Sequence, residues 1–182
     1  RKLELEYFTS KGVWNKVPRQ QAFAQTGEPP ISVRWVDVNK GDDLNPKYRS
    51  RLVARQMKAT DTPGKSFFAP TPPLESLRLV LSPAATSAGD WRVCRDPTSK
   101  KRTQISLVDI SRAYFNATVD EDMATFVQLP AEDEGAGVLC GKLNRHMYGT
   151  RGAADGWQEE YSTTLISLGF RQGESCPHVF WH

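Results

Sequence analysis

Asp109 is the residue whose position in this sequence most clearly predicts chemistry. It follows directly on an apolar run that consists of Ile105, Leu107 and Val108. A short apolar run between polar residues predicts a buried strand, which would bring the Asp109 carboxylate to the edge of a sheet, with a helical turn beginning at Ser111. A carboxylate there suits a hard divalent cation, which prefers oxygen ligands. The alternative is that Asp109 only caps the turn of residues 110–116, as Asp often does at a strand-to-helix junction.

Three arginines share one face, together with Val53, of a strand predicted near residues 48–57, because side chains in a strand alternate between its two faces. They are Arg49, Arg51 and Arg55. The opposite face, which we expect to pack, carries Tyr48, Ser50, Leu52 and Ala54. One interpretation is a functional cationic surface. The alternative is an exposed sheet edge on which charge prevents aggregation.

Composition and charge limit the class of protein without identifying it. The chain has 182 residues, of which 38% are hydrophobic and 25% charged, an ordinary balance for a globular domain with one sizeable core. The net charge of +3 is too small to indicate nucleic-acid binding by itself, but residues 34–65 hold eight Lys or Arg against four Asp. Residues 119–134 hold six acidic residues and no basic one.

The three widely spaced cysteines argue against a disulfide framework and for an intracellular, reducing setting. No apolar run is long enough for a membrane span.

The elements that must position these side chains are predicted to form an α+β arrangement of two lobes. Besides the strand before Asp109, strands are predicted near residues 31–38, 48–57, 125–129 and 138–143. The first two are joined by a stretch rich in Asn, Asp, Gly and Pro, which indicates a hairpin turn. Apolar residues recur at helical spacing over residues 153–168 and predict a helix there. We expect the lobes to be residues 1–70, with the basic hairpin, and residues 71–182.

Residues 59–66, ATDTPGKS, satisfy a relaxed phosphate-loop pattern of a small residue, any four residues and Gly-Lys-Ser. A working phosphate loop needs a helix that opens at the lysine, because backbone N–H groups at the helix N-terminus bind the phosphates. Pro70, Pro72 and Pro73 forbid a continuous helix there. Lys65 is therefore interpreted as a surface lysine, and a phosphate-loop nucleoside triphosphatase is retained only as an unrelated alternative.

The stretch from Asp109 to Tyr114 resembles the first catalytic motif of reverse transcriptases, in which an Asp ends a strand and an aromatic residue follows five positions later. Further blocks, in order along the chain, resemble the copia-type branch of LTR-retrotransposon enzymes. They are GVWNKVP at 12–18, RWV at 34–36, YRSRLVAR at 48–55, FAP at 68–70, LESLRL at 74–79, MYG at 147–149, Trp157, and GF at 169–170. Each block alone is weak, but their common order is specific. By this resemblance the chain is identified as a member of the family.

The resemblance implies an RNA-directed DNA polymerase with a right-hand fold, in which two Mg²⁺ ions, or Mn²⁺, support templated nucleotidyl transfer. Asp109 would bind both metals, and the backbone carbonyl of Ile110 would bind the metal on the triphosphate side. Tyr114 would be a steric gate under the sugar that leaves no room for a 2′-hydroxyl, while Phe115 packs in the core. Backbone N–H groups near Ala113 and Tyr114 would contact the phosphates.

The resemblance assigns further residues to nucleotide binding. The fingers hairpin of these polymerases lies over the incoming triphosphate, where guanidinium groups form strong hydrogen bonds with phosphate. The residues in that place are Arg49, Arg51 and Arg55. Arg151 stands where the family usually has Lys and would also reach the nucleotide. The chain departs from the family at Gly152 and Ala154, where Gln and Pro are usual, and this affects nucleotide positioning.

The family's second catalytic motif, an adjacent Asp pair in a hairpin, does not occur after Asp109; the only such pair is Asp42-Asp43. Since one carboxylate cannot hold two divalent ions against their mutual repulsion, we expect a polyprotein fragment that is not catalytic alone. It would comprise a fingers-like lobe (1–70) and a fingers helix with partial palm (71–182).

The partners implied by the resemblance are an RNA or DNA template with primer, deoxynucleoside triphosphates, and the remaining palm, thumb and ribonuclease H of the parent polyprotein. The expected location is intracellular, in a cytoplasmic virus-like particle of the parent element, without a membrane. The alternative is a decayed or co-opted remnant that binds nucleic acid without catalysis.

Overall fold

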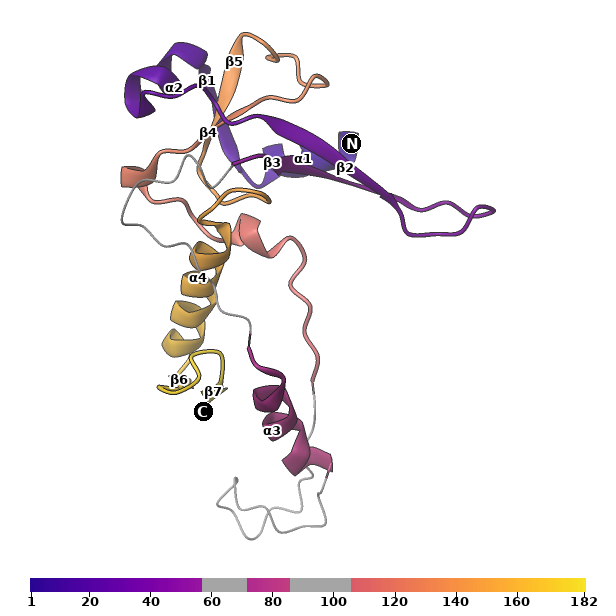
Figure 1. The fold of residues 1–182 in the computed structure, drawn as a ribbon, viewed down its shortest axis with the longest axis vertical. Coiled ribbons are helices and arrows are strands. Elements are labelled where there is room, and N and C mark those ends of the chain that lie inside the picture. The colour runs from indigo at the N-terminus through magenta and orange to yellow at the C-terminus, as the bar shows by residue number, and fades with distance from the viewer. Residues whose placement is uncertain (57–71, 86–105) are drawn as a thin grey trace. The chain divides into compact units, whose positions relative to one another are not determined.

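Two compact units make up the chain in the computed structural model, which describes residues 1–56, 72–85 and 106–182 (Figure 1). The units are Arg1–Ala69 with Arg112–Tyr161, and Pro70–Ser111 with Ser162–His182. The division crosses the predicted lobes, whose assignment as fingers and palm stays a prediction. The phosphate-loop pattern and the FAP block lie outside the described residues. Helices and antiparallel sheets are both present, which confirms the α+β class.

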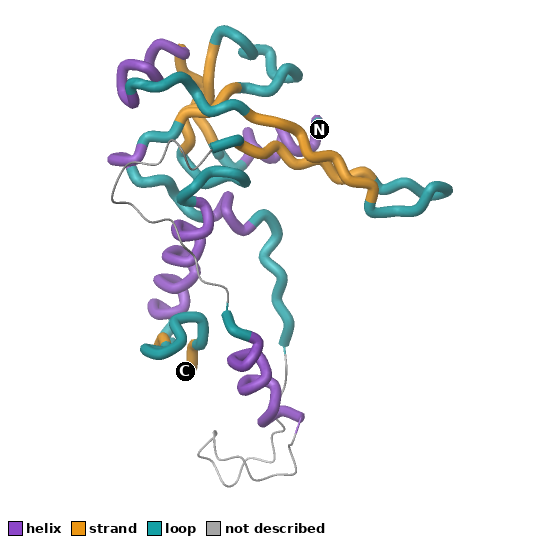
Figure 2. The backbone as a smooth tube through the Cα atoms, in the orientation of Figure 1, coloured by secondary structure: helices purple, strands orange, loops and turns teal. Residues whose placement is uncertain are grey.

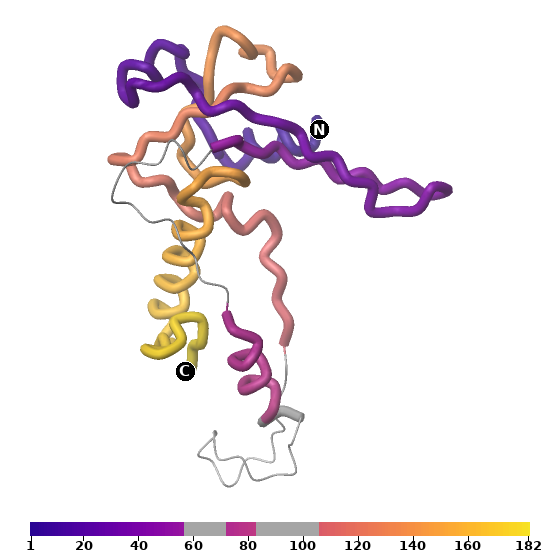
Figure 3. Tube along the Cα trace, in the orientation of Figure 1, coloured from indigo at the N-terminus to yellow at the C-terminus, as the bar shows by residue number. Residues whose placement is uncertain are grey.

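An antiparallel three-stranded sheet forms part of the first unit. Its order is β1 (Trp14–Pro18), β5 (Leu139–Leu143) and β4 (Phe126–Gln128). Strands from distant parts of the sequence therefore lie side by side (Figures 2 and 3). A Cβ at Gly141 would come within 3.0 Å of the Trp14 ring, so glycine makes room for the indole. Helix α2 (Arg19–Thr26) follows β1 directly and buries Ala22. The strands predicted near residues 125–129 and 138–143 are confirmed.

The predicted basic hairpin is also confirmed. Strand β2 (Val33–Asn39) pairs antiparallel with β3 (Tyr48–Ala54) along their whole lengths. Short polar side chains hold the turn: Asn39 Oδ1 accepts the N–H of Lys47 at 2.8 Å, and Asp42 Oδ1 accepts two further backbone N–H groups. Such local hydrogen bonds favour a turn over continued strand. Asp42, from the only Asp-Asp pair, thus serves the turn.

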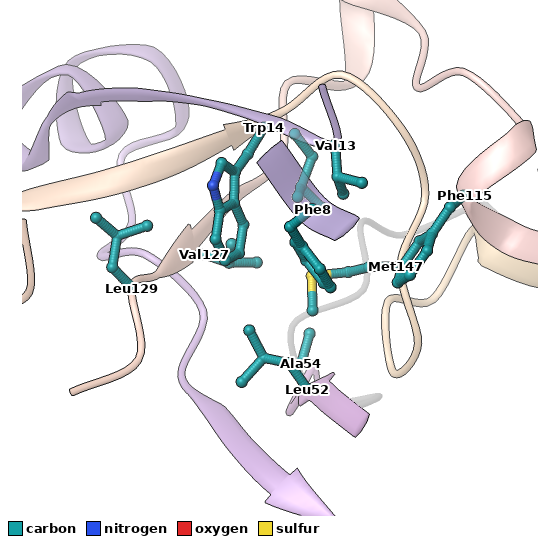
Figure 4. Close-up of a cluster of buried hydrophobic side chains, with 10 residues drawn as sticks. Phe8, Val13, Trp14, Leu52, Ala54, Phe115, Val127, Leu129 and Met147 are labelled. Carbon is teal, nitrogen blue, oxygen red and sulfur yellow. The ribbon is translucent and has the colours of Figure 1, made fainter. Parts of the chain in front are cut away.

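One apolar cluster joins the hairpin and the sheet to the N-terminal helix α1 (Lys2–Ser10) (Figure 4). Phe8 is fully buried, and its ring centroid lies 4.6 Å from that of Trp14 and 4.9 Å from that of Phe115. Leu52 of β3 is fully buried in the same cluster. These positions confirm that Phe115 packs in the core and that Leu52 and Ala54 of β3 pack inward, whereas Tyr48, predicted on the same face, is 76% exposed. Phe115 and the β2–β3 hairpin therefore pack against the same core.

The second unit is built from short elements. It contains α3 (Leu74–Ala85), the end of α4 (Ala153–Ser167), and a small hairpin of β6 (Arg171–Gln172) and β7 (Phe180–Trp181). The Ser76 hydroxyl lies 3.3 Å from Cys176 Sγ, and this contact joins α3 to the loop between β6 and β7. Helix α4 begins in the first unit and confirms the helix predicted at residues 153–168.

The buried strand predicted before Asp109 is wrong for the described residues 106–110, which form no strand. Leu107, Val108 and Ile110 are 94%, 80% and 47% exposed. A strand needs hydrogen bonds to a neighbouring strand, and no strand in the described part of the chain pairs with this segment. An apolar pattern records a tendency to be buried, but burial also requires a partner surface.

Candidate nucleotide-binding site

Arg51 and Tyr148 form the centre of a candidate site in the first unit. Arg51 stands on β3 opposite Val36 of β2, and its guanidinium carbon lies over the Tyr148 ring, 5.5 Å from the centroid. Its Nε is buried and has no hydrogen-bond partner among the described residues. Burial raises the pKa of the Tyr148 hydroxyl, although the nearby guanidinium groups of Arg51 and Arg49 oppose this shift. The raised pKa keeps the Tyr148 hydroxyl protonated, and the π face of the neutral ring stabilises the Arg51 cation.

Tyr148 also contacts the turn that follows Asp109 in the sequence and carries Tyr114 and Phe115, here called the aromatic turn. That turn is the short 3₁₀ helix η2 (Ala113–Asn116). The Tyr148 ring centroid lies 5.2 Å from that of Tyr114 and 5.5 Å from that of Phe115, at interplanar angles of 67° and 71°. Edge-to-face geometry of this kind is favourable for aromatic rings. We call Arg51, Tyr148 and Tyr114 the Arg–Tyr–Tyr stack.

The backbone on either side of Tyr148 is bonded to the end of β3. The N–H of Ala54 donates to the Tyr148 carbonyl at 2.8 Å, and the N–H of Gln56 donates to the Gly149 carbonyl at 3.3 Å. The side-chain oxygen of Gln56 accepts the Arg151 N–H at 2.8 Å. Gly149 has a φ of +82°, and a Cβ there would collide with the Ala54 carbonyl oxygen. Only glycine allows the two backbones to approach so closely.

The other sequence-predicted nucleotide residues also fall in the first unit. Arg49 and Arg55 are exposed, and Arg55 Nε donates to Ser32 Oγ at 3.0 Å. Arg151 is half-buried, as is Ala113, the first residue of η2. The structure thus gathers into one unit Arg49, Arg51, Arg55, Ala113, Tyr114 and Arg151. Their roles toward a nucleotide stay predictions.

The predicted metal ligands, Asp109 and Ile110, lie in the second unit and are exposed. The alternative that Asp109 caps the following turn is wrong, because the residue at the N-cap of η2 is Arg112. Mg²⁺ needs several oxygen ligands, and the described residues contain no group of three or more His, Cys, Asp or Glu that could hold a metal ion. One carboxylate and one carbonyl do not fit two divalent ions, so we assign no chemical step in this chain to a metal.

Sequence reasoning missed the central position of Tyr148. In the sequence this residue is only part of the Met-Tyr-Gly block, and nothing there indicates that its ring contacts both an arginine of the hairpin and Tyr114. The one usable signal is Gly149, since an isolated glycine after a packed aromatic often marks a close backbone approach. The partner of that approach, β3, is far away in the sequence.

Residues 22–181 match the family model described as reverse transcriptase (RNA-dependent DNA polymerase). The matched span includes Asp109, the basic hairpin and all of the Arg–Tyr–Tyr stack. The chain belongs to the reverse transcriptase family. The family match confirms the resemblance drawn from the ordered sequence blocks, and reverse transcriptases generally use divalent metal ions.

A relative among known proteins supports the copia-type branch. It is the retrovirus-related Pol polyprotein from transposon TNT 1-94 of Nicotiana tabacum, which is 25% identical over 163 residues. The aligned region covers 85% of this reverse transcriptase chain but 11% of the polyprotein. No solved structure matches the chain. Among the helices within residues 1–56, 72–85 and 106–182, none is both long and apolar enough to cross a membrane.

Proposed function

We propose that this chain supplies the fingers and the first half of the palm of an RNA-directed DNA polymerase in a copia-type retrotransposon polyprotein. Its ligands in this proposal are an RNA or DNA template with primer and a deoxynucleoside triphosphate. The remaining palm, the thumb and the ribonuclease H of the polyprotein would complete the enzyme, and the working location would be a cytoplasmic virus-like particle.

The Arg–Tyr–Tyr stack is the observation that carries this proposal. A guanidinium has a rigid fork of N–H donors that matches phosphate oxygens. In Arg51 the Nε is buried and the cation lies over the Tyr148 ring, so the orientation of the group is restricted before any ligand arrives. A charge that only protects a sheet edge needs no such support. We therefore favour phosphate binding over the edge-protection alternative for Arg51.

Tyr114 extends the same site toward the sugar. Its ring is half-buried and rests edge-to-face on Tyr148, so the position of Tyr114 is coupled to that of the Arg51 guanidinium. A ring held there would restrict the space at the sugar, while the N–H groups of Ala113 and Tyr114 would bind phosphate oxygens. In this arrangement Tyr148 aligns both Arg51, which would bind phosphate, and Tyr114, which would be the sugar gate.

The metal-dependent part of the reaction is assigned to the complete enzyme. Two Mg²⁺ ions, or Mn²⁺, would supply positive charge next to the triphosphate there. Asp109 and the Ile110 carbonyl would contribute ligands, and further carboxylates would come from elsewhere in the polyprotein. We propose that the 182 residues bind primer–template and nucleotide but do not extend a primer by themselves.

Equilibrium binding of a fluorescent deoxynucleoside triphosphate to the chain on a primer–template, read by anisotropy, tests this proposal. Arg51→Ala should weaken the affinity by about tenfold or more, since hydrogen bonds to charged groups contribute about 1.5–3 kcal/mol and 1.4 kcal/mol is tenfold. Lys11→Ala is the matched control, because it removes the same charge from an exposed residue at the end of α1. Equal losses in both variants, or no loss in Arg51→Ala, would contradict the proposal.

Primer–template binding separates the polymerase fragment from a co-opted remnant. Both should bind nucleic acid with an affinity that falls steeply with salt, because phosphate contacts release counterions. Only the polymerase fragment should also bind the triphosphate through Arg51. Nucleic-acid binding without any Arg51-dependent triphosphate binding would favour the remnant.

A further inference from the structure

Arg112 has an unusual backbone conformation at the entry to the aromatic turn. Its φ of 52° and ψ of 46° are left-handed, and it is the only residue other than glycine with a positive φ in the described part of the chain. Long side chains rarely adopt this region, and such outliers tend to occur at functional segments. The Arg112 carbonyl accepts the Phe115 N–H at 3.0 Å. The conformation of Arg112 therefore sets the direction of the turn that carries Tyr114.

The side chain of Arg112 is held by helix α1. Its Nε and Nη2 both donate to Glu4 Oε2, at 3.1 and 2.8 Å. Tyr7 lies one turn further along α1, and the Arg112 guanidinium carbon is 4.0 Å from the centroid of the Tyr7 ring. The guanidinium is thus fixed by a carboxylate and by an aromatic face, two interactions that restrict its orientation in different directions.

Glu4 is buried to a degree that carboxylates rarely reach. It is 4% exposed, and its Oε1 is buried without a hydrogen-bond partner among the described residues. A buried carboxylate is costly unless a counter-charge accompanies it, and removing either partner leaves an uncompensated charge. Exposed ion pairs contribute little because water and side-chain entropy compete with them. This pair differs, because the Glu4 carboxylate is almost fully shielded from solvent and Arg112 supplies its counter-charge at Oε2.

Helix α1 contacts the turn at a second point, since the Tyr7 and Phe115 ring centroids are 5.8 Å apart. The family match begins at residue 22, so α1 lies outside it. We propose that Glu4 and Tyr7 are positioning residues that hold Arg112 in its left-handed conformation and thereby orient Tyr114 against Tyr148. The relevance to nucleotide selection rests on the proposed function; the anchoring itself does not.

Backbone amide hydrogen exchange, followed by NMR on the 182-residue chain, tests the anchor without any nucleotide. In Glu4→Gln the side chain keeps its size and loses its charge. The Phe115 amide, which bonds to the Arg112 carbonyl, should exchange about tenfold faster or more, because the turn opens locally. The Leu143 amide, which donates to the Thr125 carbonyl at 2.8 Å in the sheet, should be unchanged.

Asp133→Asn is the matched control. It breaks the 2.7 Å ion pair between Lys16 and Asp133, and the Asp133 side chain is also largely buried, at 10% exposure. This variant should leave the Phe115 exchange rate unchanged. An equal acceleration in both variants, or an equal acceleration of the Phe115 and Leu143 amides in Glu4→Gln, would overturn the proposal by showing only a general loss of stability.

If Glu4→Gln unfolds the chain because Arg112 loses its counter-charge, a double variant still tests the proposal. Glu4→Leu with Arg112→Met removes both charges at similar volume, which folded proteins often tolerate. The Leu143 amide should then stay protected, while the Phe115 amide exchanges about tenfold faster, because methionine has no anchor for the left-handed conformation. Wild-type exchange of Phe115 in the folded double variant would overturn the proposal.

Comparing ribonucleoside and deoxyribonucleoside triphosphate affinities in Glu4→Gln separates this proposal from the proposed function. Faster Phe115 exchange together with a changed affinity ratio supports both. Faster exchange with an unchanged ratio supports the anchor and counts against Tyr114 as the sugar gate.

Discussion

Residues 106–110 and 113–116, the two halves of the motif around Asp109, are close in sequence but differ in structure. The second half is a 3₁₀ turn in which Phe115 is fully buried. The first half has no regular structure, and its apolar side chains at 107 and 108 are mostly exposed. The left-handed Arg112 stands directly before the turn. The half that carries Tyr114 is thus held by the core of the first unit, whereas the half that carries Asp109 has no pairing strand among the described residues.

The largest effect is expected for Asp109→Asn in a polypeptide completed with the family's Asp pair. Primer extension should fall by roughly a thousandfold or more, because the substitution removes the proposed metal ligand. Primer–template affinity should be unchanged, because the phosphate contacts remain. Asp43→Asn, at an exposed position of the hairpin turn, is the control and should retain activity. Retained extension in Asp109→Asn would remove the metal role from this residue.

Stability should distinguish the same two halves. Phe115→Ala should lower the free energy of unfolding by about 3–5 kcal/mol, because it leaves a cavity in the core. Leu107→Ala should change it by less than about 0.5 kcal/mol, because Leu107 is 94% exposed. Urea denaturation measures both values. Similar losses in the two variants would show that the segment before Asp109 is buried in solution.

Gly149→Ala tests how closely the Tyr148 segment must approach β3. We expect this substitution to lower the free energy of unfolding by at least about 2 kcal/mol, through backbone strain and through the clash with the Ala54 carbonyl. Gly137→Ala is a matched control, because Gly137 also has a positive φ, of +84°, but a Cβ there meets nothing within 4 Å. The control should lose only about 1–2 kcal/mol, from strain alone. Equal losses in thermal or urea unfolding would mean that the close approach contributes nothing.

Tyr114→Ala should have a smaller effect, on sugar selection, in the completed polypeptide. The ratio of kcat/KM for ribonucleotides to that for deoxyribonucleotides should rise about tenfold, because in the proposed site the ring would no longer fill the space of the 2′-hydroxyl. Tyr48→Ala, a 76% exposed tyrosine on β3, is the control and should leave the ratio unchanged. A wild-type ratio in Tyr114→Ala would reduce Tyr114 to a packed aromatic residue.

The smallest effect concerns the surface contact between the hairpin and the loop after β4. Arg1 donates to Asp37 at 2.8 Å and to Glu132 at 2.6 Å. Hydrogen bonds from Trp35 and then from Arg1 lower the pKa of Glu132, and Arg1 lowers the pKa of Asp37. A lowered pKa in the folded state means that this contact is fully formed above the ordinary carboxyl pKa and is lost as pH falls through the lowered value.

The Trp35 indole N–H resonance reports this titration, because Trp35 Nε1 donates to Glu132 Oε2 at 2.9 Å. It should shift only in acid, below the ordinary Glu range, and stay constant near neutral pH. Glu132→Gln should remove most of that titration. A shift of the wild-type resonance near neutral pH would contradict the assignment to these carboxylates.

Local sequence patterns predicted correctly those elements whose pairing segment is also indicated by the neighbouring sequence, as in the β2–β3 hairpin. The alternation over residues 48–55 indicated which face of β3 packs; buried Leu52 and Ala54 confirm this for the end of the strand, whereas Tyr48 at its start is 76% exposed and the prediction is wrong there. The turn-rich stretch after Asn39 indicated the hairpin, because short polar side chains bond to their own backbone neighbours. The apolar run before Asp109 misled, because periodicity reports a preference for burial and not the presence of a surface to be buried against.

The sequence by itself determined the family, through the order of its blocks, and the local structure that short-range hydrogen bonds and alternation dictate. Tertiary structure decided how the motif residues are held. It placed Tyr148 between Arg51 and Tyr114, and it set Arg112 against Glu4, 108 positions away in the chain. Such contacts depend on how distant segments pack and on which charges lose their water together. These are properties of the folded chain that no single segment carries.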